Sequence, residues 1–225
     1  MNWKALLAVL ITVGIIGLLM ATDIGKNYSQ LMSSTVGNFF SGILDRYMGG
    51  GEEFSILLDA DKNAFYGQTY SVSNVTVSAD GICQSSVTVG NTVMPLEGKL
   101  CSVEARNAKG QFEFTAGGSV KFAGVADMMV VDGYPFLPTA GSFEANFEVI
   151  PTTDFELKGL EQTKIRLNSV SGSIQGTKGE TQLSIDNLGG GRLEVSNFNG
   201  DLKLDGESML LVGLATSVKG KDFSW

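Results

Sequence analysis

The chain has 225 residues, of which 43% are hydrophobic and 18% charged, with 29 glycines, 13 phenylalanines and only 4 prolines. This is the composition of a folded domain, because disordered chains are poor in apolar residues and collagens carry glycine at every third position. Histidine is absent, which excludes Ser-His-Asp and Cys-His catalysis and every His-liganded metal site. The net charge of -8 argues against a nucleic-acid partner, which needs clustered Lys and Arg.

An uncharged apolar run occupies residues 5–22. As a helix it is about 26 Å long at 1.5 Å per residue, close to the thickness of a bilayer core. Lys4 precedes the run and Asp23 follows it. This asymmetry predicts a cytoplasmic tail at 1–4, a single-pass transmembrane helix at 5–22 that acts as a signal-anchor in the cell membrane, and an extracytoplasmic remainder. The alternative is a cleaved secretory signal, although Leu19-Met20-Ala21 makes a poor cleavage site.

The junction Lys4-Ala5-Leu6-Leu7 offers a second interpretation of this end. It resembles the basic-small-apolar site at which archaeal pilin-type precursors are cut before their hydrophobic helix. The resemblance covers four residues, and the acidic residue that bacterial type IV pilins carry near the start of the mature helix is missing. It implies a pilin-like subunit of a surface filament, assembled through its N-terminal helix.

Residues 23–48 predict an amphipathic helix, because their apolar side chains recur at steps of three and four. Gly49-Gly50-Gly51 then forms a hinge that ends it. The apolar stripe could pack on the following domain, lie in the membrane interface, or mediate self-association through residues 24–48. Its polar face is only weakly basic, so tight binding to anionic lipid is not expected.

From residue 52 to 225 the hydrophobic period changes to two. Apolar and polar residues alternate along 143–149, and several other segments show the same pattern. Gly and Asn interrupt the alternation at intervals typical of hairpins, at 107–110, 117–118, 189–191 and 199–200. The segment therefore predicts about a dozen strands and no helix, in an all-β domain built as an antiparallel β sandwich, a jelly roll or a curled meander sheet.

Two cysteines, Cys83 and Cys101, fall in the part predicted to lie outside the cytoplasm. Folding 83–101 into one hairpin about Thr92 sets them opposite each other. We therefore expect a disulfide, with two buried free thiols as the alternative.

Asp59, Asp61 and Asn63 have the alternating oxygen donors that begin a calcium-binding EF-hand loop. Ala64 stands where that loop requires glycine, and Tyr70 stands where it requires a bidentate Glu. A turn between two strands explains the same residues, since Asp and Asn side chains bond their own backbone. Calcium is therefore a weak expectation here.

The remaining motifs are few. Asn27 and Asn74 begin acceptor sequences for N-glycosylation. No phosphate-binding glycine motif precedes a helix, and the carboxylates are scattered. We expect no catalytic residue and no cofactor.

These features together predict a non-enzymatic, membrane-anchored protein with an extracytoplasmic β domain. Its role at the cell envelope is binding or structural, and it holds a lipid or a partner protein. The order of parts is similar to that of the lipopolysaccharide-bridging protein of the Gram-negative inner membrane. That likeness is architectural, because no motif residues are shared and the helix at 24–48 is an insertion. The expected partners are the bilayer and an envelope protein.

Overall fold

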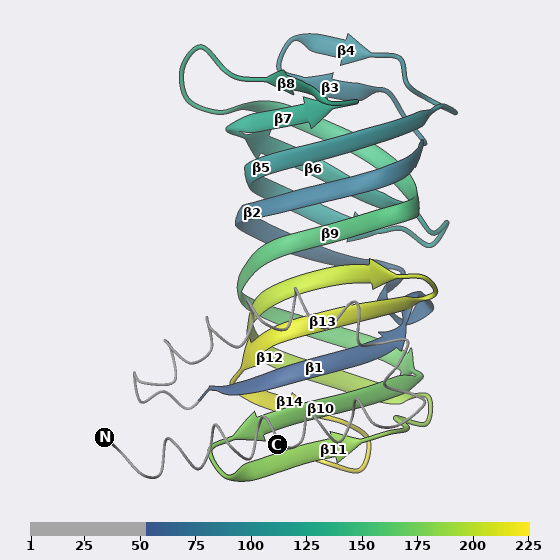
Figure 1. Cartoon of the computed structure of the whole chain (residues 1–225), viewed down its shortest axis with the longest axis vertical. Helices are drawn as coiled ribbons and strands as arrows, with labels where there is room; N and C mark the ends of the chain where they lie inside the picture. The colour runs from purple at the N-terminus through teal and green to yellow at the C-terminus, as the bar shows by residue number, and fades with distance from the viewer. Residues whose placement is uncertain (1–52) are drawn as a thin grey trace. The chain divides into compact units, whose positions relative to one another are not determined.

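The computed structural model describes residues 53–225, and most of their backbone lies in strands of one antiparallel sheet (Figure 1). The predicted tail, transmembrane helix, amphipathic helix and hinge lie outside the described residues, as does Asn27. Within 53–225, no helix has both the length and the apolar character needed to cross a membrane. The predicted class, mainly antiparallel β, is confirmed.

The strands differ widely in length, from 3 residues in β3 to 28 in β9. In chain order they are β1 (Phe54–Asp61), the 3-10 turn η1 (Lys62–Phe65), β2 (Gln68–Cys83), β3 (Val87–Val89), β4 (Thr92–Met94), β5 (Leu100–Phe114), β6 (Val120–Ala126), β7 (Met128–Val131), β8 (Tyr134–Phe136), β9 (Phe143–Val170), β10 (Gly172–Lys178), β11 (Thr181–Ile185), β12 (Gly191–Asp205), β13 (Ser208–Ala215) and β14 (Ser217–Lys219).

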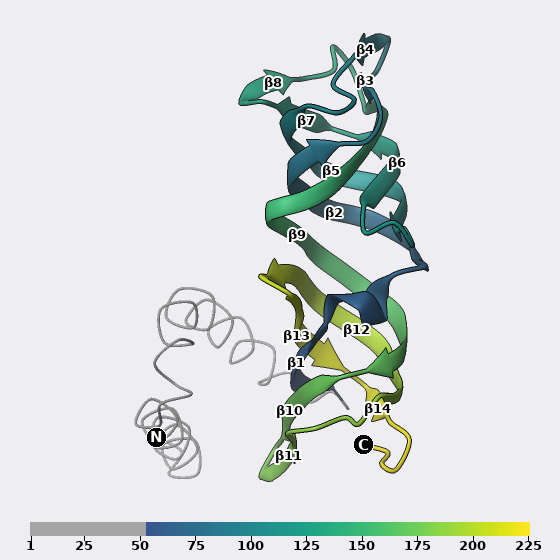
Figure 2. The same cartoon turned by 90° about the vertical axis from the view of Figure 1, so that its right-hand side faces the viewer.

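Strand β9 is the spine of the sheet, whose order is β11-β10-β1-β13-β12-β9-β2-β5-β7-β8. The start of β9 pairs with β6, its middle with β2 and its end with β12. Because β6 also pairs with β5, strands β9, β2, β5 and β6 close into a ring. We call β2 to β8, with the loop that leads from β8 to β9, the upper half, and β1 with β10 to β14 the lower half. Figure 2 shows β9 passing from one half to the other.

The core follows from the alternation. Buried side chains alternate with more exposed ones along β1 and along stretches of β2 and β9, and the alternation breaks where those strands are irregular. Burial of each large apolar side chain contributes about 1.5–3 kcal/mol. The rings of Phe112 and Phe155 stack at 5.5 Å, and Phe114 meets both edge to face. The fully buried phenylalanines are Phe54, Phe65, Phe112, Phe114, Phe122, Phe147, Phe155 and Phe198.

Two segments predicted as turns are instead interior parts of long strands. Residues 107–110 lie within β5 and residues 199–200 within β12. Asn107 has a left-handed φ of 47° and lies beside a register shift between β2 and β5. Asparagine adopts this conformation readily, and here it forms a β-bulge that bends the strand instead of a turn that ends it. The predicted turn at 117–118 does separate two strands, as do residues 189–190, whereas Gly191 is the first residue of β12.

Paired glycines let neighbouring strands approach closely. Gly200 lies opposite Gly213 across β12 and β13, and the ring of Phe198 covers both. A Cβ on Gly213 would collide with the carbonyl oxygen of Asn199 and lie 2.8 Å from that ring. The lack of a side chain here makes room for the aromatic ring.

Candidate functional site

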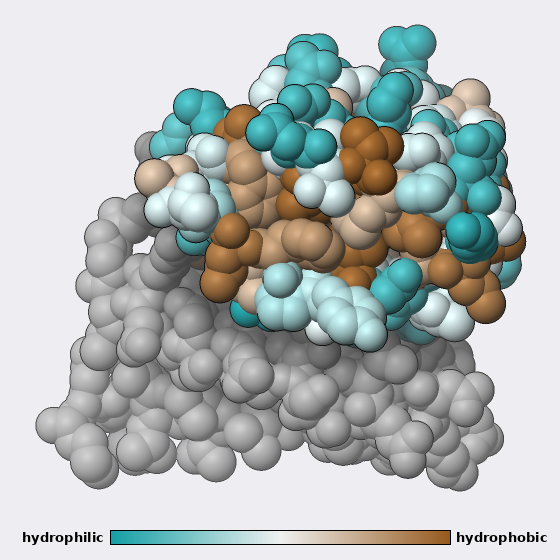
Figure 3. Space-filling view, turned by 90° about the horizontal axis from the view of Figure 1, so that it is seen from above, coloured by the Kyte–Doolittle hydropathy of each residue, from teal (hydrophilic) through white to brown (hydrophobic). Residues whose placement is uncertain are grey.

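Six large hydrophobic side chains are exposed within 53–225, and all belong to the upper half: Ile82, Val93, Leu100, Val125, Tyr134 and Leu137. Leu100, Tyr134 and Leu137 are each at least 70% exposed. Figure 3 looks down on this end and shows apolar side chains gathered there, with hydrophilic ones around them. We call Ile82, Val93, Leu100, Tyr134 and Leu137 the apolar end. Exposed apolar side chains gathered at one end of a domain mark an interaction site more often than a lone apolar residue does.

In the lower half, the C-terminal tryptophan packs against the core. Trp225, the last residue, packs edge to face on Phe54 at 4.4 Å. Its backbone exchanges hydrogen bonds with Val218 of β14, its N–H donating over 2.8 Å and its carbonyl accepting over 2.9 Å. The chain therefore covers its own apolar interior at this end, whereas the upper half leaves apolar side chains in solvent.

The disulfide lies directly beneath the apolar end. Cys83 and Cys101 are bonded, with Cα atoms 5.9 Å apart, and both are buried. Their chain neighbours Ile82 and Leu100 face each other across β2 and β5. The bond thus joins the last residue of β2 to the start of β5. Ile82 and Leu100, two members of the apolar end, are next to the bonded cysteines in the chain.

The segment between the cysteines is not the single hairpin predicted about Thr92. It forms a small hairpin, β3 with β4, whose turn is at 90–91 and which pairs with β9. Cys101 lies opposite Gly81 rather than Cys83, so the bridged cysteines are diagonal neighbours. The β2–β5 ladder sets this register, and the intervening residues bulge out to the neighbouring strand.

The sheet edges at the apolar end are poor templates for another strand. β4 and β8 have three residues each, and each pairs with one neighbour only. Pro135 stands in the middle of β8 and has no amide hydrogen to donate. Short edges and proline are devices that discourage strand addition. The apolar end is therefore suited to contacts through side chains.

The charges around the apolar end are mostly negative. Glu97 and Asp132 are exposed, and Asp132 accepts a hydrogen bond from the backbone N–H of Ser102 at 2.9 Å. Lys99 is the nearby cation, and its Nζ donates to the carbonyl of Pro95 at 3.0 Å. The surface has no basic cluster for an anionic bilayer, to which each Lys or Arg contributes about 1 kcal/mol.

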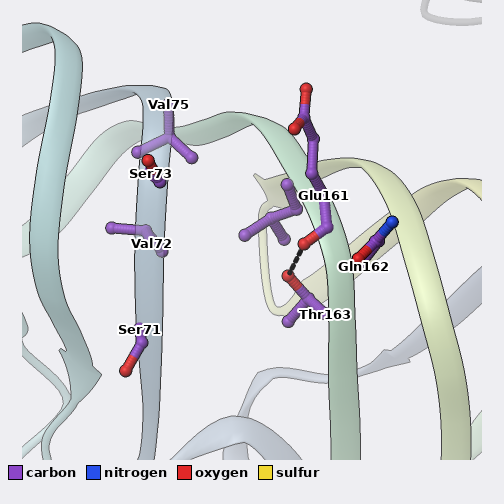
Figure 4. A pocket seen from close by; sticks show the side chains of 8 residues that line it. Ser71, Val72, Ser73, Val75, Glu161, Gln162 and Thr163 are labelled. Carbon is purple, nitrogen blue, oxygen red and sulfur yellow. Dashed lines mark hydrogen bonds between the residues drawn. The ribbon is translucent and has the colours of Figure 1, made fainter.

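Two cavities lie where the halves meet. The first, of about 270 Å³, opens where β2 and β9 separate, beyond their last paired residues Thr76 and Lys158. Figure 4 shows its polar lining from both strands, with the Thr163 hydroxyl donating to the Glu161 carbonyl over 3.1 Å. The lining residues are Ser71, Val72, Ser73, Val75, Leu160, Glu161, Gln162 and Thr163.

The second cavity, of about 240 Å³, is mostly apolar, and we call it the lysine cavity. Four separate stretches of chain line it: the η1 segment, the β5–β6 turn, the middle of β9 and the β12–β13 turn. Lys62 is its one cation, with Nζ 2.6 Å from Oε2 of Glu207, and this hydrogen bond raises the pKa of Lys62. The lining residues are Lys62, Tyr66, Phe114, Gly117, Gly118, Val120, Ile150, Pro151, Phe155, Leu204 and Met209.

The candidate calcium ligands form a turn. Asp61 caps η1, and its carboxylate accepts hydrogen bonds from the backbone N–H of Asn63 at 2.8 Å and from its side chain at 2.6 Å. Asp59 lies within β1. Over residues 53–225, no three His, Cys, Asp or Glu side chains are grouped to hold a metal. Asn74, the described glycosylation candidate, is exposed in β2 with a left-handed φ of 58°.

Sequence reasoning did not identify the apolar end or the lysine cavity. Their residues come from segments that only the sheet register brings together. Searches of protein-family models, curated proteins and solved structures find no match to this chain.

Proposed function

We propose that this chain is a non-enzymatic, membrane-anchored binding module of the cell envelope, whose extracytoplasmic β domain docks a partner protein through the apolar end. One observation carries the proposal. All the large exposed hydrophobic residues of 53–225 lie in the upper half, while the lower half covers its interior with Trp225.

The position of the apolar end supports a tethered module. The chain enters the described domain at β1, which belongs to the lower half and pairs with β10 and β13. The apolar end belongs to the upper half, where the last residues of β2 and the first of β5 meet the short strands β4 and β8. A domain anchored through the predicted helix at 5–22 would then keep its binding surface apart from its attachment point.

The charges favour a protein over a lipid surface as the partner. Glu97 and Asp132 border the apolar end and outnumber Lys99 there, so the local charge does not attract an anionic bilayer. A protein with an apolar patch rimmed by basic residues is complementary to it. The blunt edges of β4 and β8 predict that this partner binds through side chains.

The test uses the full-length chain in the membranes of its own cell. The protein is extracted in mild detergent, and its assembly mass is compared with that of a Leu100→Ser/Leu137→Ser variant. We expect a complex heavier than the chain by the mass of another protein, and loss of that complex in the variant. A Thr181→Ser/Gln182→Ser variant, altered on exposed β11, is the control and should keep the complex.

Three outcomes would oppose the proposal. A mass equal to the chain alone removes the partner, and a multiple of the chain mass replaces it with self-association. Loss of residues 1–5 from the intact mass would favour the pilin-like subunit instead.

A further inference from the structure

We infer that the outer side of β9, β12 and β14 lies against the anionic lipid head groups of the membrane that anchors the chain. Its four cations, Lys164, Arg166, Arg192 and Lys219, are called the basic face. The inference deepens the proposed function and rests on the membrane anchor. It adds a second surface, which sets the orientation of the domain and leaves the apolar end free for a partner.

Strand alternation places the four cations on the outer side of the sheet. Successive side chains of a strand point to opposite faces. Each member of the basic face is exposed, and each has a buried apolar neighbour in its own strand. The buried neighbours are Ile165, Leu167, Leu193 and Val218. The cations therefore point away from the core and into solvent.

One row of charges crosses the three strands. Arg166 of β9 lies opposite Glu194 of β12, and Glu194 lies opposite Lys219 of β14. Glu194 forms ion pairs with Lys164 at 2.7 Å and with Arg166 at 3.1 Å. The hydrogen bonds from these two cations lower the pKa of Glu194. Glu194 is thus a charged carboxylate that holds two of the cations side by side.

The basic face reverses the charge balance of the chain. The whole chain has 24 Asp and Glu against 16 Lys and Arg, whereas here four cations surround the single carboxylate of the row. The outward residues between them, Asn168, Ser196 and Ser217, are uncharged. Within the described residues, Arg192 and Lys219 take part in no ion pair. Both can meet an anion from outside the domain.

The chain enters the domain beside these strands. The side-chain amide of Asn199, in β12, donates to Oε1 of Glu53 at 3.0 Å. Its Oδ1 accepts from the backbone N–H of Gln162, in β9, at 2.9 Å. Gln162 lies two residues before Lys164 in the same strand. A domain held by the predicted helix at 5–22 is therefore attached near its basic face.

An anionic lipid surface fits this arrangement. Each Lys or Arg close to such a surface contributes about fivefold to binding, and the effect falls off within a Debye length of about 8–10 Å. The acidic remainder of the domain is repelled by the same surface, so the domain turns its basic face toward it. The anchor keeps the domain at a high local concentration beside the bilayer. A few cations are then enough to set its orientation.

The test measures how close the basic face comes to the bilayer in the full-length protein. The chain is reconstituted in nanodiscs of phosphatidylcholine alone, or with one third phosphatidylglycerol, and both carry an acceptor dye on a head group. A donor dye is attached at Asn168→Cys, because Cys83 and Cys101 are bonded to each other. We expect stronger energy transfer in the phosphatidylglycerol discs. The increase should vanish in about 1 M NaCl, where the Debye length is about 3 Å.

Substitutions locate the effect on the molecule. Arg166→Gln/Arg192→Gln should lower the ratio of docked to undocked domains about 25-fold, because each cation contributes about fivefold. Lys109→Gln/Lys121→Gln is the matched control. It removes the same charge from exposed positions of β5 and β6 and should leave the transfer unchanged. Thermal unfolding checks the fold of each variant, and the lipid and salt comparisons need no substitution in the basic face.

The outcomes separate this inference from the proposed function. The purified chain carries no partner protein, so docking at the apolar end does not enter the measurement. A chain that does not co-purify with nanodiscs lacks the anchor on which both proposals rest. Equal transfer in the two kinds of disc, or equal loss in the two double variants, would overturn the inference and leave the anchored module intact. Loss of the increase in sodium phosphate, but not in NaCl of equal ionic strength, would also overturn it, in favour of a site for free phosphate.

Discussion

At the residue scale, the disulfide is the bond whose loss is easiest to interpret. Its cysteines are 18 residues apart in the chain, and closing a loop of this size stabilises the fold by about 3 kcal/mol, mainly through the unfolded state. Replacing both Cys83 and Cys101 by Ala should lower the free energy of unfolding by about that amount in a denaturant titration. Reduction of the wild type should produce a similar decrease, and an unchanged midpoint in both experiments would show that the bond contributes nothing.

Replacing the buried Tyr70 should raise the free energy of unfolding, whereas loss of the disulfide should lower it. Within 53–225, the Tyr70 hydroxyl is the one buried side-chain oxygen or nitrogen without a hydrogen-bond partner, and its ring packs against Phe114. A buried unsatisfied polar group costs about 1–3 kcal/mol. Tyr70→Phe should therefore raise the free energy of unfolding at pH 7 by about 1 kcal/mol. A destabilised variant would indicate that the hydroxyl has a partner.

The same residue makes stability depend on alkaline pH. Burial raises the pKa of Tyr70 above its ordinary value of 10.0, because the charged phenolate is disfavoured in the core. Below pH 10 both folded and unfolded states hold the proton, and the contribution is complete. Above pH 10 the unfolded state loses it first, so stability falls by about 1.4 kcal/mol per pH unit until the folded group titrates. Denaturant titrations at several pH values should show this slope in the wild type and a shallower one in Tyr70→Phe.

At the scale of elements, the long strands show what the sequence can predict. Alternation correctly placed residues 143–149 in a strand, yet β9 continues to Val170. Pro151 and Gly159 resemble strand breakers, but each lies at an irregularity where β9 shifts register, Pro151 against β2 and Gly159 against β12. Whether a proline or glycine ends a strand or bends it depends on the neighbouring strands, which one sequence does not reveal.

The candidate sites follow the same rule. The cysteine pair could be predicted, because two cysteines in an expected extracytoplasmic domain have few other roles. The lysine cavity could not, because Lys62, Val120, Phe155 and Met209 come from four distant segments. The apolar end could not be predicted from the sequence for another reason. Leu100 and Leu137 look like core residues in the sequence, and only the sheet edge shows that nothing in 53–225 covers them.

The close packing at the paired glycines Gly200 and Gly213, in the β12–β13 hairpin, can be tested by substitution. Gly213→Ala should lower the free energy of unfolding by about 2 kcal/mol, because its Cβ collides with the Asn199 carbonyl and with the Phe198 ring. Gly117→Ala is the matched control. Its Cβ would meet only the Thr115 hydroxyl at 3.7 Å, so its unfolding free energy should change little. Equal effects of the two substitutions would contradict the packing argument.

At the scale of the whole described domain, β9 couples the two halves. It pairs with β6 and β2 above and with β12 below, and Phe155 in its middle is fully buried against Phe112 and Phe114. Phe155→Ala should cost about 3–5 kcal/mol and reduce amide protection in β5 and β12 together, as measured by hydrogen exchange. Loss of protection in one half alone would show that the halves unfold separately.

The most direct test of the account is a photo-crosslink from the apolar end in living cells. A photoreactive amino acid is placed at Leu137, and in a separate strain at Gln182 on β11, in the full-length membrane-anchored chain. We predict one specific crosslinked protein from position 137, absent from position 182 and lost when Leu100→Ser is added. Crosslinks of equal pattern from both positions, or none from position 137, would contradict the claim that the apolar end docks a partner.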